Sequence, residues 1–416
     1  MNKKNLFVLG LLLQAAAGMT ETLSLEDCIG LAMAGNPELK RSEYAAVQSA
    51  ISARQAWSSL LPRVSANAST SSNGPFVSET NEAWDWNMGG SVSQPFYSPG
   101  LYTRIGLAGT QKKSSEYALD SQRDQVRASV EMLYYQILTS DTLLEVYRAN
   151  IDLAGEQIEK MRRMVELGMK RESDLLKSEV QRGSFEAQLV REQESLASSK
   201  RSLNILMGRR PDAEVDLLPL SVHEVQVPAF DHACAMMLEN SPLIRRMKAQ
   251  VDAEKLSLRI AKEAFLPSVS GSYSYSKSRN TFSTGDPIES DALRLNVSLD
   301  LFDGFNKIQN VQAGRLGLKE SQLNYEATAR DAVEALLGQY KALETQNRLI
   351  GIHQTNLASA RKDLEVVSQQ YASGFSTILD LTDAQVSVFE SEASLLQDLF
   401  ARKRIEAEIR RLIGAI

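Results

Sequence analysis

Aspartates that follow two similar glycine turns are the side chains of this sequence best suited to chemistry. Asp174 follows Gly168 by six residues, and Asp380 follows Gly374 by six. Both stand near the predicted start of a helix, where the helix dipole favours a carboxylate, and this is a sufficient reason for Asp174. Asp383 comes three residues after Asp380, so these two carboxylates share one face of their helix and can act on a cation together.

Motifs for enzyme chemistry are missing from the sequence. It has three histidines, His223, His232 and His353, at no spacing that suits a metal site. There is no HExxH motif, paired-cysteine metal site, nucleophile elbow or phosphate-binding loop. Most carboxylates stand beside lysine or arginine on predicted helices, as solvated surfaces do. The sequence therefore predicts a protein that is not an enzyme and needs no cofactor or metal.

The first residues have the character of a secretory signal peptide. Lys3 and Lys4 precede an apolar run, Leu6–Leu13, which leads into small residues that end at Gly18. This order predicts a signal peptide over residues 1–18. Removing its two lysines takes the formal net charge from −6 to −8. An acidic mature chain argues against nucleic acid as a partner.

The mature sequence is a duplication, because matching pieces recur at a nearly constant spacing. They stand 205 or 206 positions apart, as in the Leu-Pro steps at 61–62 and 266–267, the segments VSQPFY from Val92 and VSLDLF from Val297, and the glycines at 168 and 374. We therefore expect a first repeat over 19–208, an equatorial linker over 209–229 and a second repeat over 230–416.

Each repeat is predicted to contain the same series of elements. A helix comes first and ends at the Leu-Pro step, since proline disfavours helix in the residue before it. Two strands with a polar loop between them follow, and then two long helices joined at a glycine turn. The expected helices include 37–61, 101–167, 174–207, 242–266 and 378–413, and the expected strands are 63–71, 87–97, 268–278 and 292–302.

The long helices carry heptads of apolar residues, which are typical of coiled coils. A helix over 101–167 would be about 100 Å long, more than a compact core can cover. The sequence thus predicts a mainly α fold of long antiparallel coiled-coil helices with a small β part. The heptad positions are Val130, Ile137, Leu144, Ile151, Ile158 and Val165, and Leu336, Leu343, Ile350, Leu357, Leu364 and Tyr371.

The fourth predicted strand has two different faces. Its apolar residues Leu293, Leu295, Val297 and Leu299 alternate with polar ones, so one face is apolar and the other is wet. Four strands cannot close a barrel with a usable lumen, and in lipid only a closed barrel satisfies the hydrogen bonds of strands. We therefore expect three copies of the chain to form a twelve-stranded barrel, with these four side chains facing lipid.

Together these features resemble the TolC-like outer-membrane efflux proteins over essentially the whole mature chain. The matching pieces are LSLEDCIGLAMAGNPEL near the start, both Leu-Pro steps, FDG after the fourth strand, YASGFSTILDLTDAQ at the second hairpin and the ending RRLIG. The resemblance implies a homotrimer with its barrel in the bacterial outer membrane and a helical tunnel in the periplasm. It also implies a belt around the tunnel over 209–230, and two partners, a periplasmic adaptor (membrane fusion protein) and an inner-membrane pump.

The resemblance also implies a periplasmic gate at the turns between the long helices. Aspartates matching Asp380 and Asp383 form charged rings at the closed entrance of such channels, and Asp174 belongs to the same region. Ser376 stands where the family often has a basic residue. Lys170 or Arg171 in the first hairpin are the candidates to replace it.

The adaptor is expected to dock at the same two turns. They are the periplasmic extremity of the duct and they interrupt the heptads. The residues assigned to this docking site are Gly168, Gly374, Phe375 and Ser376.

Three functions are consistent with the sequence. The first is an exit duct for small-molecule efflux, and the second is the same duct serving type I protein secretion; the lumen does not distinguish them. The third is a trimeric coiled-coil surface fibre or adhesin. Duplicated strand pairs and helices that return on themselves argue against a fibre, because a fibre needs neither.

Overall fold

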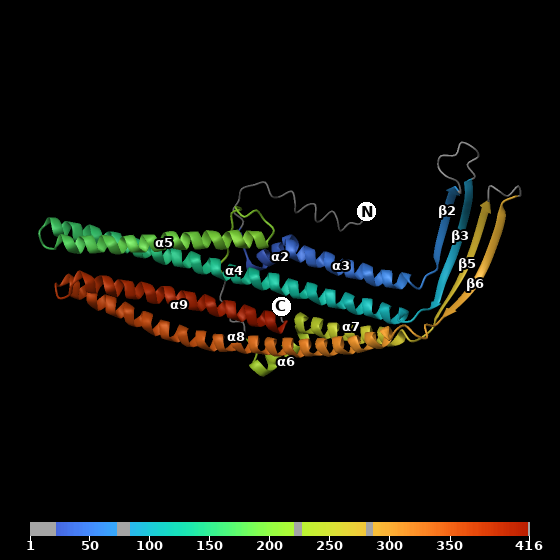
Figure 1. Cartoon of the computed structure of the whole chain (residues 1–416). Helices are drawn as coiled ribbons and strands as arrows, with labels where there is room; N and C mark the ends of the chain where they lie inside the picture. The colour runs from blue at the N-terminus through green and yellow to red at the C-terminus, as the bar shows by residue number, and fades with distance from the viewer. Residues whose placement is uncertain (1–21, 73–83, 220–226, 280–285, 415–416) are drawn as a thin grey trace. The chain divides into compact units, whose positions relative to one another are not determined.

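The computed structural model describes residues 22–72, 84–219, 227–279 and 286–414 (Figure 1). The predicted signal peptide and His223 lie outside the described residues. The described chain forms two compact units. The unit called here the hairpin unit comprises residues up to Lys40, 121–241 and 332 onward, and the unit called the sheet unit comprises 41–120 and 242–331.

The sheet unit holds a four-stranded antiparallel sheet in the order β2-β3-β5-β6. Its strands are β2 (Arg63–Ser72), β3 (Trp84–Tyr97), β5 (Ser268–Arg279) and β6 (Ile288–Ser298). Each repeat supplies one β-hairpin, as the sequence predicts, and β3 pairs with β5 to join the two β-hairpins. Within the described residues, β2 and β6 each have one edge without a partner strand.

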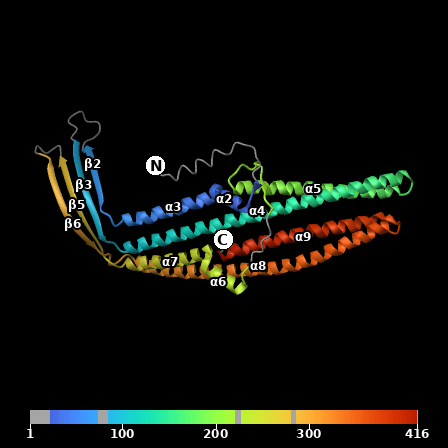
Figure 2. The same cartoon turned by 180° about the vertical axis from the view of Figure 1, so that it is seen from behind.

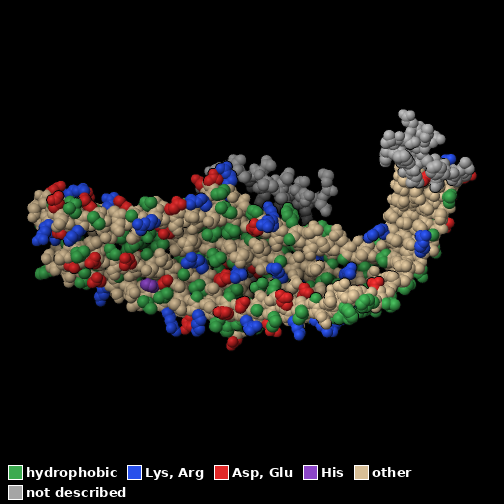
Figure 3. Space-filling model, viewed as in Figure 1, with side chains coloured by type: hydrophobic (Ala, Val, Ile, Leu, Met, Phe, Trp, Pro, Cys, Tyr) green, Lys and Arg blue, Asp and Glu red, His purple; other side chains and the backbone are tan. Residues whose placement is uncertain are grey.

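Register across the sheet puts apolar side chains in common rows. Val64 pairs with Val92, Val92 with Tyr273, and Tyr273 with Leu293. Since side chains alternate between the faces of a strand, this row places apolar side chains on one face of the sheet across all four strands. In the view of Figure 3 the sheet is mostly tan, the colour of uncharged polar side chains and backbone.

The fourth strand ends earlier than the sequence predicts. We expected a strand over 292–302, whereas β6 covers 288–298. Oδ2 of Asp303 accepts a hydrogen bond from the backbone N–H of Lys307 at 2.9 Å, and this bond marks the start of the next helix. Gly304 and Phe305, between these two residues, have positive φ. This turn competes with the strand, so Leu299 lies just beyond its end.

Helices of the sheet unit continue from the strands. They are most of α3 (Pro37–Ser58), α7 (Pro242–Glu263) and the first parts of α4 (Leu101–Glu166) and α8 (Asn306–Ala372). Thr103 on α4 donates to Oε2 of Glu263 on α7 at 2.7 Å. Gly100, at the start of α4, has φ of 77°.

The hairpin unit contains two long helical hairpins (Figures 1 and 2). The first is α4 with α5 (Glu172–Leu206), and the second is α8 with α9 (Ile378–Ile413). This confirms the predicted mainly helical fold with a small β part. Charged side chains of both signs are scattered over the visible helical surface (Figure 3). Within the described ranges, none of the helices combines the length and apolar character needed to cross a membrane.

Shorter elements that the sequence analysis missed complete the hairpin unit. They are α2 (Leu25–Gly35), α6 (Phe230–Asn240), and the parallel pair β1 (Thr22–Leu23) and β4 (Asp216–Leu217). A core of Ala233, Met237, Leu336, Ile409 and Ile413 joins α6 to α8 and α9. Arg410 on α9 donates to Oε2 of buried Glu131 on α4 at 2.7 Å, so the two repeats are linked by charge here.

Two glycines meet where α2 ends beside the end of α5. Gly208 has φ of 69°, and a Cβ on it would clash with the backbone of Gly35. Asn36 donates from Nδ2 to the carbonyl of Leu206 at 3.0 Å. In the second repeat Gly414 lies against Asn240 in the same way, so the duplication extends to this joint.

Candidate functional site

The turn between α4 and α5 is closed by the backbone alone. Gly168 has φ of 70°. Its backbone N–H donates to the carbonyl of Val165 at 2.9 Å, and the backbone N–H of Met169 donates to the carbonyl of Met164 at 2.8 Å. Satisfying the last carbonyls of a helix in this way requires a left-handed residue, which glycine supplies at little cost. A Cβ at Gly168 would meet open space, so φ rather than crowding restricts this position.

The turn between α8 and α9 repeats this arrangement. Gly374 has φ of 80°, and the N–H of Phe375 donates to the carbonyl of Gln370 at 2.8 Å. Ser376 turns back and donates from Oγ to the carbonyl of Val367 at 3.3 Å. Its hydroxyl therefore serves the turn itself.

Asp380 is the acid of a capping box at the start of α9. Its Oδ2 accepts from the backbone N–H and the hydroxyl of Thr377, both at 2.7 Å. Its own N–H donates to Oγ1 of Thr377 at 3.2 Å. These bonds, the side-chain one first, hold the pKa of Asp380 below its ordinary value. The predicted gate residue thus also stabilises its helix.

Asp380 and Asp383 lie together in an acidic groove between α8 and α9. The groove has a volume of about 480 Å³ and adds a third carboxylate, Asp363, which the sequence analysis missed. Both Asp380 and Asp383 are exposed. Asp363 stands on α8 beside the heptad residue Leu364. The pairing of α8 with α9 could therefore have indicated that Asp363 belongs to this groove. The groove is lined by Asp363, Val367, Gln370, Phe375, Ser376, Asp380, Asp383, Ala384 and Ser387.

Asp174 does not line that groove. It lies near Tyr371, whose pKa is raised by burial and by the negative charge of Asp174. Lys170 places its ammonium 4.2 Å from the centroid of the same ring. Tyr371 also packs on the cluster of Met161, Ile378 and Leu381 that joins the two hairpins. The three predicted gate aspartates therefore divide into a groove pair and one residue beside the hairpin contact.

Large apolar side chains are exposed at both turns. Leu167 is 75 % exposed and Met169 is 69 % exposed in the first, and Phe375 is 87 % exposed in the second. Exposed apolar side chains at a turn can contribute to a contact with another protein. They accompany Gly168, Gly374 and Ser376 of the predicted docking site.

The predicted lipid-facing residues share the apolar face of the sheet. Leu293, Leu295 and Val297 are exposed by 83 %, 71 % and 62 % and pair with Tyr273, Gly271 and Val269 of β5. The opposite face is rich in serine, and hydroxyl pairs cross it, as between Ser268 and Ser298 at 2.6 Å. The sheet is therefore two-sided in the sense that the sequence predicts.

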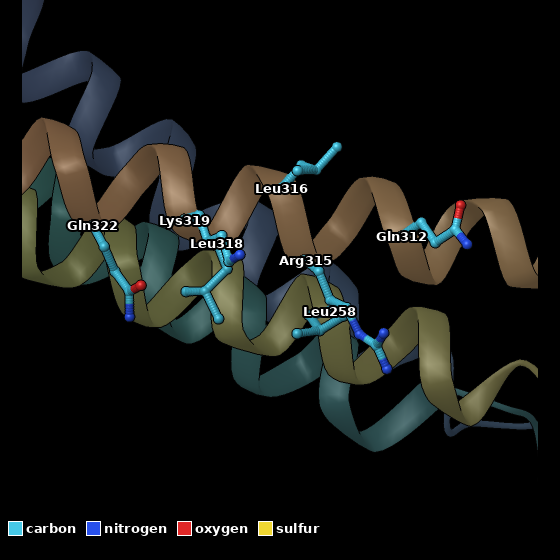
Figure 4. A pocket seen from close by; sticks show the side chains of 7 residues that line it. All are labelled: Leu258, Gln312, Arg315, Leu316, Leu318, Lys319 and Gln322. Atoms are coloured by element: carbon cyan, nitrogen blue, oxygen red, sulfur yellow. The ribbon is translucent and has the colours of Figure 1, made fainter.

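A second groove lies between α7 and α8 of the sheet unit (Figure 4). Its volume is about 530 Å³, and its lining holds aliphatic, amide and basic side chains. No carboxylate, histidine or cysteine is among them. The lining residues are Leu258, Gln312, Arg315, Leu316, Leu318, Lys319 and Gln322.

Comparison with known proteins gives one consistent family. A model of the outer membrane efflux protein family matches the chain twice, over residues 28–209 and 234–415. The alkaline protease secretion protein AprF of Pseudomonas aeruginosa is 21 % identical over 334 residues, covering 78 % of this chain and 69 % of AprF. The outer membrane protein TolC of Vibrio cholerae is 22 % identical over 338 residues, covering 77 % of this chain and 76 % of TolC.

Solved structures agree on the fold. A crystal structure of CusC superposes with a TM-score of 0.84 at 17 % sequence identity, covering 94 % of this chain and 92 % of that one. The two-fold match of the family model also agrees with the duplication in the sequence.

Proposed function

We propose that this chain, which belongs to the outer membrane efflux protein family, forms a homotrimeric exit duct that conducts small molecules across the periplasm and outer membrane. The observation that carries the proposal is the sheet, with its apolar face and its open edges at β2 and β6. An unpaired edge in lipid is costly. Pairing β6 of one copy with β2 of the next closes the sheet, and three copies supply twelve strands, a number found in outer-membrane barrels.

The helical hairpins form the periplasmic part of the duct in this proposal. At 1.5 Å per residue α8, with 67 residues, is about 100 Å long. The turns at its far end meet the periplasmic adaptor, which links the duct to an inner-membrane pump. The exposed side chains of Leu167, Met169 and Phe375 support this docking site. The division into repeats at 19–208 and 230–416, with the equatorial linker between them, belongs to the same proposal.

The entrance is the acidic groove. Three copies bring Asp380 and Asp383 around one axis, where rings of carboxylates favour cations. Conduction of this kind requires a lined lumen and no reacting group, so the chain acts without enzymatic activity. Asp174, beside Tyr371, contributes to holding the hairpins together at the entrance rather than to the ring itself.

A second candidate function is the outer-membrane part of type I protein secretion. One relative is named an alkaline protease secretion protein, and this favours the candidate. The two functions share the duct and differ in the partner. Mild crosslinking in native membranes, followed by identification of the co-purified inner-membrane protein, distinguishes a small-molecule pump from a protein exporter.

The trimer is tested by native mass spectrometry of the protein extracted from outer membranes, together with conductance in planar bilayers. We expect a three-copy mass and stable conductance. A stable monomer that keeps its sheet, or a trimer without conductance, would contradict the proposal.

A further inference from the structure

Two arginines stand at the two edges of a single row of the sheet. Arg63 of β2 pairs with Ser93, Ser93 pairs with Ser272, and Ser272 pairs with Arg294 of β6. The row therefore crosses all four strands, with a guanidinium at each end and serine between. Both arginine side chains are exposed. Arg63 is the first residue of β2, so the row lies near the end of the sheet from which the helices continue.

This row belongs to the polar face, which otherwise carries little charge. Asp85, eight residues along β3 from Ser93, is about 27 Å away. Between these levels the described rows of this face contain no charged side chain. They are Ser65, Ser91, Ser274 and Ala292; Asn67, Gly89, Ser276 and Ser290; and Ser69, Asn87, Ser278 and Ile288.

The charge of Arg294 is not balanced by its hydrogen-bond partner. Its Nη1 donates to Oγ of Ser274 at 3.3 Å, a neutral hydroxyl. Lys277, on the opposite face, is different, because its ammonium lies 2.7 Å from Oε1 of Glu289. Among the described residues, Lys277 is thus paired with a carboxylate, whereas the hydrogen-bond partner of Arg294 is a hydroxyl.

We propose that Arg63 and Arg294 form an anion-binding band around the lumen, at the end of the barrel that joins the helices. The band rests on the proposed function, because it needs the polar face to line a closed ring. Pairing of β6 with β2 of the next copy would put Arg294 and the next Arg63 on adjacent strands, displaced along the strands by the stagger that closing a barrel requires. Two arginines per chain then give six in three copies.

The chemistry of the band defines its ligands. Rings of arginine or lysine select anions in pores, and a guanidinium binds carboxylate or phosphate through paired, charge-assisted hydrogen bonds. Several guanidiniums around one lumen suit a solute with several such groups better than a solute with one. The ligand class is therefore small molecules that carry more than one carboxylate or phosphate.

Planar-bilayer recordings on the full-length assembly test the band, with inorganic tripolyphosphate added on the barrel side. We expect the anion to block the current of the unmodified protein. Arg63→Gln with Arg294→Gln should raise the half-blocking concentration by about tenfold or more, since each hydrogen bond to a charged group contributes a factor of about ten. Lys277→Gln, on the other face, should leave block unchanged.

The possible failures are distinguishable. Normal conductance with no block, or block that survives the double substitution, overturns the band and leaves the duct intact. Absence of conductance in the unmodified protein overturns the proposed function. If the double variant does not assemble, Arg294→Gln alone replaces it and should raise the half-blocking concentration, while Arg63→Lys with Arg294→Lys should keep block.

Discussion

The ammonium nitrogen of Lys170 lies 4.2 Å from the centroid of the Tyr371 ring, and this contact joins the turns of the two helical hairpins. Lys170 follows α4, and Tyr371 stands in the last turn of α8. A cation over an aromatic face contributes about 0.5–1 kcal/mol at an exposed site. The tyrosine hydroxyl reaches the sulfur of Met161 at 3.5 Å, so ring and hydroxyl both hold the first hairpin to the second.

Replacing the ring should loosen the entrance. Tyr371→Leu removes the cation–π contact and should increase the open-channel current in planar bilayers, because the hairpins separate at lower cost. Tyr371→Phe keeps the ring but loses the hydroxyl contact with Met161, so its current should lie between those of the unmodified protein and Tyr371→Leu. Lys170→Gln should act like Tyr371→Leu, and the matched control Lys177→Gln on α5 should not. Equal currents for the leucine and phenylalanine variants would show that the cation–π contact does not hold the entrance closed.

Charge on the two faces of β6 should have unequal effects. The middle of this strand is Leu293, on the apolar face, and its neighbour Ala292 lies on the polar face. Leu293→Arg should destabilise the assembled barrel by roughly 2–4 kcal/mol if it faces lipid at mid-depth. Ala292→Arg should assemble nearly normally, since it faces water. The measurement is the assembly yield, taken as the trimer fraction in outer membranes. Equal yields for the two variants would contradict the assignment of the two faces.

Phe305 stores strain that its duplicate avoids. It has φ of 66°, and the residue 205 positions earlier, Gly100, has φ of 77°. The left-handed region costs a residue with a Cβ roughly 1–2 kcal/mol. Phe305→Gly should therefore raise the free energy of unfolding by about 1 kcal/mol, after the entropy lost by glycine. Thermal melting in detergent measures it.

The control for this change is the reverse one. Gly100→Ala should destabilise, because its Cβ would lie 3.0 Å from Cγ2 of Ile260 in addition to the strained φ. If Phe305→Gly lowers stability instead, the contact of its ring with Phe302, at 5.3 Å between centroids, outweighs the strain.

The glycine joint between α2 and α5 should tolerate no side chain. Gly208→Ala combines a left-handed φ with a clash against the backbone of Gly35, and neither can relax through a side-chain rotation. We expect a loss of at least about 2 kcal/mol. Gly183→Ala, inside α5 with open space around its Cβ, should instead stabilise by about 0.8–1 kcal/mol. Chemical unfolding followed by helical circular dichroism compares the two.

The pH dependence of cation selectivity at the entrance should depend on the hydroxyl of Thr377. A carboxylate whose pKa is lowered keeps its charge, and its cap, until the pH falls through that lowered value. Thr377→Val removes the largest cause of the low pKa of Asp380, so the pH at which cation selectivity is half lost should move upward. Thr382→Val, whose hydroxyl bonds to the carbonyl of Ile378, is the control. Reversal potentials in a salt gradient measure both.

Selectivity itself tests the groove. Asp380→Ala with Asp383→Ala should weaken cation selectivity and relieve block by trivalent cations added on the periplasmic side. If selectivity and block persist, these carboxylates serve only their helix.

Local patterns were sufficient to predict most of the fold. Heptads and the duplication predicted both hairpins, and alternation predicted all four strands. The end of β6 was predicted wrongly because Leu299 and Leu301 continue the alternation into a turn. The competing signal was Asp303, whose carboxylate starts α8. Comparison of Phe305 with Gly100 would have indicated the left-handed turn.

The candidate site was less predictable, because its contacts join distant parts of the chain. The sequence grouped Asp174 with Asp380, since both follow glycine turns. The structure separates them: Asp174 lies near Tyr371 and Asp380 lies in the groove with Asp363. No spacing within one helix reveals which residue of the other hairpin faces it. Pairing of Lys170 with Tyr371 depends on the register between α4 and α8, which heptads alone leave open.

The two open sheet edges have a genetic consequence. In the proposed trimer, pairing of β6 with β2 joins unlike edges, so every chain in the ring uses each of its edges once. One chain with a blocked edge therefore prevents the closure of any ring that includes it. In a cell that makes normal and edge-blocked chains equally, random mixing into threes leaves about one ring in eight intact. Substitutions that block β2 or β6 pairing should therefore behave as dominant, whereas those that prevent a chain from folding at all should be recessive.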